Sequence, residues 1–514
     1  MKSVVAHSGV LLWVLFGAFA IAAIVPVILA LVYAPSYGLL DVPIASWFAL
    51  GLSGLVLALD GIAIYFWRRL RKVDLELAGL RGEPIEDRIP AVYGHECLDR
   101  AEFVPIVQAI FRRPPDVEYV HVKRLPGGYG GSATVLAQLQ REGTAHPWSR
   151  SFVIKLGDRR EMADEHDRFH NHVLLHLARA AKFFRYAAWG DLAGVAYEFV
   201  GVEPDHEVQS LYQFYQGHAA VEVSEIVAEI YTHLSQAWYR GGVIEPVNLC
   251  HEYHLLGKKR EHIISHVGEV VSEDDPYRTN FTAIEERLRP NLKPRFCPAL
   301  DIPWYDPVAF LRTWPRPGLT VPVPVHRSTV HGDLHSRNVL VEIEGDGRRH
   351  AWFIDFSHTG NGLSEDRTRQ ALREGIPVEP GRGHTLRDFC RLEADVKFVL
   401  TRLQDEHDLR LAVTFERELM AGGLALADWS VAPPPVEPLA DERFRKAWQA
   451  IREIRRRATA YLASADDPRP YYVSLLHATL PILYYQPEQF KSEACQQQQK
   501  RYALLSAGML CSQL

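Results

Sequence analysis

The sequence predicts an α+β protein of two lobes, preceded by an N-terminal hairpin of two membrane-spanning helices. Three observations indicate this architecture. Two long apolar segments stand at the N-terminus, strand patterns and glycine turns dominate residues 117–200, and the pattern is mainly helical from residue 209 onward. A chain of 514 residues is long enough for two or three units of ordinary domain size.

The composition narrows the functional classes. Lys and Arg together number 57 against 63 Asp and Glu, so there is no basic excess, and we expect no nucleic-acid partner. A hydrophobic content of 47% excludes an intrinsically disordered chain. The six cysteines form no C-x-x-C pair, which favours free thiols in a reducing compartment over a disulfide framework.

The two N-terminal apolar segments cover residues 9–34 and 44–67. Both are longer than the ~20 residues that a helix needs to cross a bilayer, and the first exceeds the apolar region of a secretory signal peptide. Because only residues 35–43 separate them, we expect a transmembrane hairpin, through which the chain could self-associate or contact partner proteins. Asp60 is the one charged residue of the second segment, and we assign it to helix packing.

Basic residues directly follow the second apolar segment, namely Arg68, Arg69, Arg71 and Lys72. The positive-inside rule then places residues 68–514 in the cytoplasm. The expected location is therefore the inner or plasma membrane, with a multi-pass topology and the large domain cytoplasmic. Residues 68–95 are interpreted as a basic juxtamembrane segment and linker.

The two lobes are assigned to residues 96–205 and 206–514. In the first lobe, apolar residues at helical spacing predict helices over residues 97–111 and 161–180. Alternating or apolar runs predict its strands, which cover residues 117–125, 133–140, 152–156, 182–189 and 194–200. The second lobe is expected to be mainly helical, with one hairpin.

The hairpin of the second lobe lies beside a cluster of polar residues. The strand-like runs on either side of Asp346-Gly347 predict a two-residue turn. This register places Asn338 opposite Asp355, with Asp333 on the loop that enters the hairpin. A neutral oxygen ligand and an anionic ligand beside a third carboxylate are suited to Mg²⁺ and a general base.

The motif His331-x-Asp333-x4-Asn338, with Asp355 downstream, resembles the signature of the aminoglycoside phosphotransferase and choline kinase group of the protein-kinase-like fold. The resemblance covers about residues 115–490 and implies a two-lobed kinase-like domain that uses ATP and Mg²⁺. It implies that Asp333 is the catalytic base, that His331 supports the catalytic loop, and that Asn338 and Asp355 are metal ligands. More loosely, the stretch 384–400 is similar to ternary complex associated domains, kinase-like modules of bacterial conflict and signalling systems.

The first lobe is expected to supply the remaining nucleotide contacts. Four glycines between two strands could let backbone N–H groups approach the ATP phosphates closely, and they are Gly127, Gly128, Gly130 and Gly131. Lys155 is placed on its strand like the lysine that holds the α- and β-phosphates in such kinases. Its helix partner is expected to be Glu165, with Glu161 as the alternative. Residues 197–200 fall where a hinge contacts adenine through its backbone.

Two further clusters are given no functional role. Zinc-like spacing occurs in one group, but histidines are frequent in this chain and no second cysteine accompanies the first. This group comprises Cys250, His251, His254, His262 and His266. A second group is interpreted as a solvated helix face, and it comprises Arg452, Arg455, Arg456 and Arg457.

These observations lead to one functional hypothesis and one alternative. The hypothesis is a membrane-anchored, ATP- and Mg²⁺-dependent phosphotransferase that transfers the γ-phosphate to a hydroxyl group, expected to belong to a small molecule. The alternative is a kinase-like nucleotide-binding signalling or scaffold module without turnover. The sequence leaves the acceptor open among aminoglycosides, choline-like alcohols, sugars and protein hydroxyls.

Overall fold

The computed structural model describes residues 90–514, except for 99, 113–116, 125–132, 142–150, 199–206, 254–294, 298–301, 306, 314–316, 364, 377, 380, 422–435, 465, 486–489 and 491. By its internal contacts the chain divides into Met1–Asp87 and Arg88–Leu514. The description below concerns the second of these units.

The predicted transmembrane hairpin is not supported. Among the described residues, no helix combines the length and the apolar character that crossing a membrane requires. The longest described helix, Glu493–Ser512, contains the four glutamines 496–499, followed by Lys500 and Arg501. The two segments assigned to the hairpin, 9–34 and 44–67, lie outside the described residues. The multi-pass membrane location, which depended on the hairpin, is withdrawn with it.

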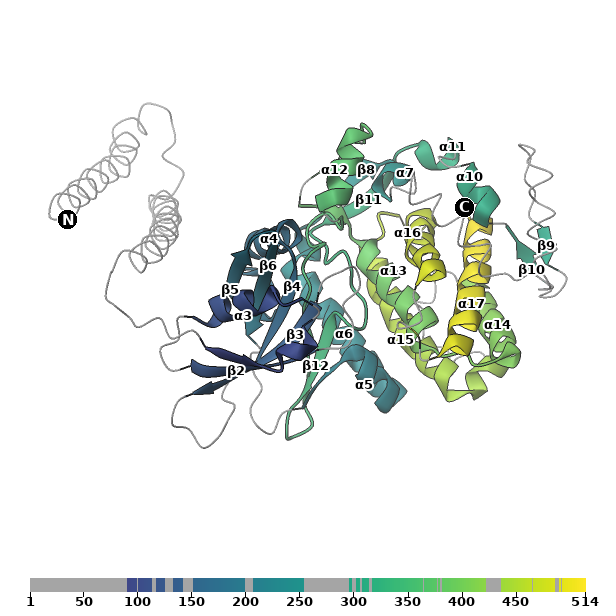
Figure 1. Cartoon of the computed structure of the whole chain (residues 1–514). Helices are drawn as coiled ribbons and strands as arrows, with labels where there is room; N and C mark the ends of the chain where they lie inside the picture. Colours follow the sequence, from purple (N-terminus) through teal and green to yellow (C-terminus); the bar gives the residue numbers. More distant parts are fainter. Residues whose placement is uncertain are drawn as a thin grey trace, which may run out of the picture. The chain divides into compact units, whose positions relative to one another are not determined.

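The first lobe is built on a six-stranded sheet (Figure 1). Its strands are β1 (Ala91–Tyr93), β2 (Val117–Arg124), β3 (Ala133–Arg141), β4 (Ser151–Asp158), β5 (Lys182–Trp189) and β6 (Leu192–Glu198). They are arranged in the order β1-β2-β3-β4-β6-β5. β1 pairs with β2 in parallel, and every other neighbouring pair is antiparallel.

The two faces of the sheet have different roles. On one face, Phe152, Ile154 and Leu156 of β4 pack in a core with helix α3 (Phe103–Phe111). Because side chains alternate along a strand, Lys155 points to the opposite face. Helix α4 (Arg159–Arg168) begins directly after β4, and it continues as the π-helical turn η4 (Phe169–Val173). A short 3₁₀ turn, η3 (His95–Cys97), precedes α3.

Three small sheets belong to the second lobe. Their strands are β7 (Glu207–Ser210), β8 (Val243–Val247), β9 (Arg295–Cys297), β10 (Ile302–Trp304), β11 (Val323–Ser328), β12 (Val339–Ile343), β13 (Arg349–Phe353) and β14 (Gly383–His384). The sheets have the orders β10-β9, β14-β11-β8 and β13-β12-β7. The β12–β13 hairpin is thus extended by a strand that comes from the beginning of the lobe.

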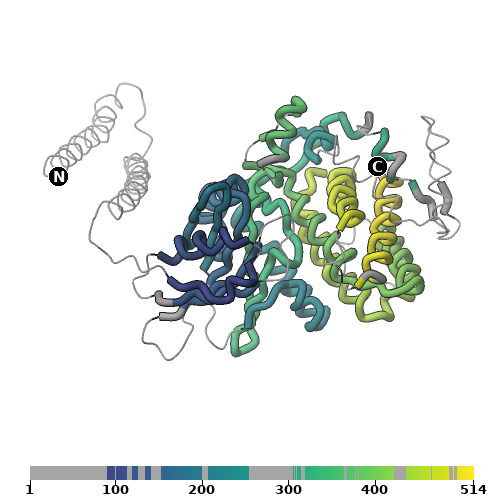
Figure 2. Tube along the Cα trace, in the orientation of Figure 1, coloured from purple at the N-terminus to yellow at the C-terminus, as the bar shows by residue number. Residues whose placement is uncertain are grey.

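The other described elements of the second lobe are helices and helical turns (Figure 2). Its first helices are α5 (Leu211–Gly217), α6 (Ala220–Ala237), η5 (Tyr239–Gly241), α7 (Leu249–Glu252), α10 (Pro307–Arg312), α11 (Pro317–Thr320) and α12 (Glu365–Arg373). The later ones are α13 (Leu386–Asp395), η6 (Val396–Leu400), α14 (Glu406–Ala421), η8 (Glu437–Ala440), α15 (Glu442–Ala458), η9 (Thr459–Tyr461), α16 (Arg469–Thr479), η10 (Leu480–Tyr484) and α17 (Glu493–Ser512).

Helix α13 is the buried centre of this lobe. It packs against α15 and α16, and its Phe389 stacks on Tyr231 of α6 with ring centroids 4.1 Å apart. Its charged residues other than Arg391 are buried, and a buried charge needs a partner. Glu393 accepts hydrogen bonds from Arg455 at 2.7 and 2.9 Å, and both side chains are fully buried. The prediction that Arg455 lies on a solvated helix face is therefore wrong.

The hairpin register differs from the predicted one by one residue. Leu340 pairs with Trp352 and Val341 with Ala351, so Asn338 lies opposite Ile354 and not opposite Asp355. The loop has three residues, because Glu344 and Arg348 still pair through Glu344 N–H and Arg348 O at 2.9 Å. Gly347 closes the loop with φ +85°, a conformation that glycine adopts readily and that defines this three-residue turn.

Candidate active site

Lys155 is the centre of a buried ion-pair cluster. Its Nζ lies 2.9 Å from Oε2 of Glu165 on α4 and 2.8 Å from Oδ1 of Asp355. The hydroxyl of Tyr197 donates to the other oxygen of Glu165 at 2.8 Å. The cluster therefore joins a strand, a helix and a segment 200 residues downstream of the lysine.

Lys155 and Asp355 hold each other in the ionised state, whereas burial raises the pKa of Glu165 despite the adjacent ammonium group. Burial alone would lower the pKa of Lys155, but the carboxylates of Asp355 and Glu165 outweigh it and raise that pKa above its usual range. Burial would likewise raise the pKa of Asp355, yet the neighbouring Lys155 ammonium lowers it. Both groups are consequently charged at neutral pH.

Asp355 has an unusual backbone conformation. Its φ of +61° is the only positive φ of a non-glycine residue in the described part of the chain. This region costs energy for an L-residue, and such residues concentrate at functional sites. The hydroxyl of Ser357 donates to Asp355 Oδ1 at 2.7 Å. The turn that follows β13 is thus shaped around this carboxylate.

The loop that carries Asp333 is fixed from below by α13. Both carboxylate oxygens of Asp388 accept from consecutive backbone N–H groups, at 2.7 Å from His331 and 2.8 Å from Gly332. The hydroxyl of Tyr239 donates to the same carboxylate at 2.8 Å. Because two rigid bonds hold two adjacent peptide groups, the position of Asp333 is set by a helix more than 50 residues downstream.

His331 links the same loop to the end of the hairpin. The side chain is fully buried, and its Nε2 lies 3.1 Å from the backbone oxygen of Ile354. A carbonyl only accepts, so Nε2 carries the proton in this bond. Burial lowers the pKa of His331, which keeps the ring neutral at pH 7. The ring thereby connects the loop of Asp333 to the residue that precedes Asp355.

Asp333 is partly exposed and paired with a guanidinium group. Arg391 Nε on α13 donates to its Oδ1 at 2.8 Å, and Nε2 of His335 lies 3.5 Å from its Oδ2. Burial would raise the pKa of Asp333, but Arg391 and His335 outweigh it and hold that pKa well below its usual range. The Asp333 carboxylate also acts to raise the pKa of Asp355, as a like charge does.

Asn338 is oriented by the loop itself. Its Nδ2 donates to the backbone oxygen of Asp333 at 2.9 Å, and the side chain is nearly buried. Since the amide nitrogen is used in this bond, Oδ1 is the atom available to a cation. A carboxylate on Asp355 and an amide oxygen on Asn338 are the hard oxygen donors that Mg²⁺ prefers.

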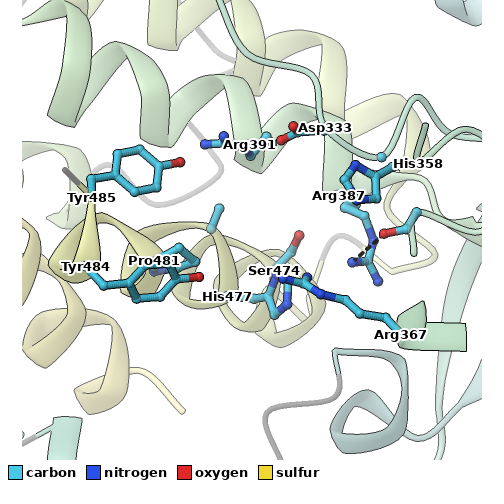
Figure 3. Close-up of a pocket in the computed structure, with 13 residues that line it drawn as sticks. Asp333, His358, Arg367, Arg387, Arg391, Ser474, His477, Pro481, Tyr484 and Tyr485 are labelled. Carbon is cyan, nitrogen blue, oxygen red and sulfur yellow. Dashed lines mark hydrogen bonds and ion pairs between the residues drawn. The ribbon is translucent and has the colours of Figure 1, made fainter. Parts of the chain in front are cut away.

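A cavity of about 190 Å³ opens beside Asp333 (Figure 3). Helices α13 and α16 and the turn η10 line it, together with residues of α12 and the catalytic loop. Arg387 and Arg391 come from α13, and Tyr484 closes the opposite side. The cavity is therefore an extension of the site toward the helical lobe.

Several predicted site residues cannot be placed. Gly127, Gly128, Gly130 and Gly131 lie outside the described residues, and so do residues 199–200 of the expected hinge. The antiparallel strands β2 and β3, which flank the four glycines in the sequence, are described. In the histidine-rich group, Cys250 is buried, while His254, His262 and His266 fall outside the described residues. Within the described part of the chain, no group of three or more His, Cys, Asp or Glu side chains could share a metal ion.

Sequence reasoning missed three residues that shape the site. They are Asp388, Arg391 and Ser357. Asp388 and Arg391 are three residues apart and lie on neighbouring positions of one helix face, inside the stretch 384–400 that attracted notice only by its similarity. No local signal marked these two residues, because the charged side chains of this stretch are typical of an exposed helix face.

No protein-family model matches the sequence, and no curated protein matches it. Among solved structures, it is similar to a thermostable mutant of the aminoglycoside phosphotransferase APH(4)-Ia in a ternary complex with AMP-PNP and hygromycin B. The identity is 13% and the TM-score 0.31, over 79% of this chain and 97% of that chain.

Two further matches are of the same kind. One is spectinomycin phosphotransferase APH(9)-Ia in complex with ADP and spectinomycin, at 11% identity and a TM-score of 0.31, over 78% of this chain and 94% of that chain. The other is an aminoglycoside-3'-phosphotransferase of type VIII, at 12% identity and a TM-score of 0.25, over 69% and 100%. All three of these matched structures are aminoglycoside phosphotransferases by name.

Proposed function

We propose that this protein is an ATP- and Mg²⁺-dependent phosphotransferase that acts on a hydroxyl group of a small molecule. The observation that carries the proposal is the ion-pair cluster in which Lys155 contacts both Glu165 and Asp355. A buried ammonium group held by a helix carboxylate is suited to binding phosphate oxygens. Phosphoryl transfer depends mainly on such positioning and on charge neutralisation.

The residues at the site divide the chemistry between them. Lys155 would hold phosphate oxygens of ATP, and Glu165 keeps its side chain in place. Asn338 Oδ1 and the carboxylate of Asp355 would hold Mg²⁺, and their donor chemistry fits this ion. Bound Mg²⁺–ATP would supply the γ-phosphoryl group and neutralise its developing charge.

Asp333 is assigned to the acceptor. Its carboxylate is ionised and partly exposed beside the cavity, so it can orient an acceptor hydroxyl and receive its proton. His331 and Asp388 are positioning residues, because they hold the loop of Asp333 without facing the cavity. This division of roles leaves the acceptor oxygen as the atom that becomes phosphorylated.

One experiment separates this proposal from a scaffold without turnover. The full-length chain is incubated with ATP, Mg²⁺ and a panel of small hydroxyl compounds, and release of ADP is measured with each. We expect at least one compound to stimulate ADP release above the rate with water alone, and Asp333→Asn to abolish the stimulation. Nucleotide binding without stimulation by any compound would instead support the scaffold.

A further inference from the structure

The cavity beside Asp333 has an unusual charge distribution. Three guanidinium groups line it, on Arg367, Arg387 and Arg391. Asp333 is the only carboxylate among the described residues of its lining, and that carboxylate is already paired with Arg391 at 2.8 Å. Arg387 is paired as well, with Glu252 at 3.3 Å, so the lining holds more guanidinium groups than carboxylates, and two of the three have a carboxylate partner.

The pairing of Arg391 leaves part of its guanidinium group available. Nε donates to Asp333, whereas Nη1 is buried and has no hydrogen-bond partner among the described residues. A buried donor without an acceptor is costly, and a ligand oxygen would relieve that cost. Since the planar guanidinium presents several N–H groups in a fixed fork, the same side chain can contact Asp333 and a ligand anion together.

The other two guanidinium groups, on Arg387 and Arg367, differ in how deeply they are buried. Arg387 is nearly buried and bonds to Glu252, at 3.0 Å to its backbone oxygen and 3.3 Å to Oε1. Its Nε is another buried donor that has no partner within the described part of the chain. Arg367 on α12 is exposed and extends toward His477 in Figure 3. One guanidinium thus forms a wall of the cavity and one stands at its mouth.

The neutral groups of the lining add hydrogen-bond donors and no negative charge. Burial raises the pKa of the Tyr485 hydroxyl to about 12, and it lowers the pKa of His358 to about 4. Both side chains are therefore neutral at pH 7. A cationic acceptor would bring a positive charge among guanidinium groups, where like charges repel strongly at low dielectric constant.

The size of the cavity also restricts the acceptor. Its volume of about 190 Å³ lies below the roughly 300–1,000 Å³ of pockets that hold drug-sized ligands. This volume suits a small acceptor better than a multi-ring aminoglycoside. A compound of a few carbon atoms would fit and could place one hydroxyl at Asp333.

From the charge and the size we infer that the acceptor is a small hydroxyl compound carrying an oxyanion, either a phosphate or a carboxylate group. Arg391 and Arg367 bind the oxyanion, and Asp333 orients the hydroxyl. This inference rests on the proposed function, since it assigns the substrate class of the same site. It narrows the acceptors that the sequence left open, because choline-like alcohols and aminoglycosides are cations.

The test uses four acceptors with the same diol and different charge. They are glycerol 3-phosphate, glycerate, glycerol and 3-amino-1,2-propanediol. The full-length chain is assayed for ADP release at saturating Mg²⁺–ATP, and kcat/KM is compared across the four. We expect the better anionic acceptor to exceed glycerol about tenfold or more, as a charge-assisted hydrogen bond implies, and the amine to be the poorest. The phosphate and carboxylate compounds distinguish the two oxyanions.

Two matched variants locate the effect. Arg367→Gln should reduce the ratio of anionic to neutral kcat/KM by about tenfold. Arg410→Gln, an exposed arginine of α14 outside the cavity lining, should leave that ratio unchanged. Glycerol or the amine reacting as well as the anionic compounds would overturn the inference, and so would an unchanged ratio in Arg367→Gln.

A binding measurement keeps the inference separate from the proposed function. Glycerol 3-phosphate and glycerate are titrated calorimetrically into the chain saturated with Mg²⁺ and AMP-PNP. Binding that weakens about tenfold in Arg367→Gln, without ADP release from any acceptor, would support an oxyanion site and contradict phosphotransferase activity. Acceptor-stimulated ADP release without binding of either anion would retain the proposed function and overturn the inference.

Discussion

Replacing Lys155 by methionine tests whether the ion-pair cluster is built as described. The substitution keeps an unbranched side chain of similar length and removes the ammonium group between Glu165 and Asp355. Removing one partner of a buried ion pair typically costs about 3–5 kcal/mol, because the other charge stays buried without compensation. Glu165 is fully buried but Asp355 is 30% exposed, so we expect the lower end, about 3 kcal/mol of unfolding free energy.

The pH dependence of this loss gives a sharper test. In the wild type, the raised pKa of Lys155 contributes stability at every pH below its unfolded value, and the lowered pKa of Asp355 contributes at every pH above its own. Both contributions are therefore constant between pH 5 and pH 8. Without the lysine, Glu165 is a buried carboxylate whose pKa rises, so protonation relieves the penalty as the pH falls. The deficit of Lys155→Met should shrink by about 1 kcal/mol or more from pH 8 to pH 5.

The assay is urea denaturation followed by tryptophan fluorescence at both pH values. Lys182→Met is the matched control, because Lys182 is exposed at the start of β5 in the same sheet. Its effect should stay within about 0.5 kcal/mol at either pH. A loss below about 1 kcal/mol for Lys155→Met, or a deficit that does not change with pH, would refute the electrostatic reasoning.

Three further predictions concern the loop and the metal ligands. Asp333→Asn should keep nucleotide binding and lower acceptor phosphorylation about 10²–10⁴-fold, since it removes the proton acceptor, and unchanged steady-state turnover would exclude this role. Asp355→Ala should abolish the Mg²⁺-dependent part of the thermal shift that AMP-PNP causes. Asn338→Ala removes only a neutral ligand and should reduce that shift without abolishing it. Equal shifts in the two variants would contradict the assignment of these residues as metal ligands. Asp388→Asn deprives one of two buried backbone N–H groups of its acceptor. It should therefore lower the unfolding free energy, measured by urea denaturation, by about 1–3 kcal/mol. It should also lower kcat without changing the ATP affinity measured by calorimetry.

Much of the structure of the first lobe could be predicted from local sequence patterns. The alternation of Phe152, Ile154 and Leu156 with Lys155 indicated which face of the strand the lysine would occupy, and α4 follows β4 directly. Such information is local, since it depends on strand and helix periods. The sequence favours Glu165 as the partner of Lys155, with Glu161 as the alternative. The position of α4 on the sheet decides between them, and the structure pairs the lysine with Glu165.

Burial that depends on contacts between distant segments could not be predicted from local sequence patterns. The charges of α13 suggest a surface helix, yet Asp388 and Glu393 are buried because a distant loop and a distant arginine satisfy them. The predicted register of the hairpin was wrong for a different reason. A glycine after an aspartate fits both a two-residue and a three-residue loop. The left-handed backbone conformation of Asp355 could not be predicted from the usual conformational preferences of aspartate, because the surrounding contacts impose it.

Direct transfer of the γ-phosphoryl group is the central claim, and one labelling measurement tests it. The full-length chain is supplied with ATP labelled in the terminal phosphate, Mg²⁺ and the best acceptor of the diol series, and the products are separated and counted. We predict that the label appears in the phosphorylated acceptor and that Asp333→Asn abolishes this product. Label found only in inorganic phosphate, or retained in ATP while the nucleotide is bound, would contradict a phosphotransferase.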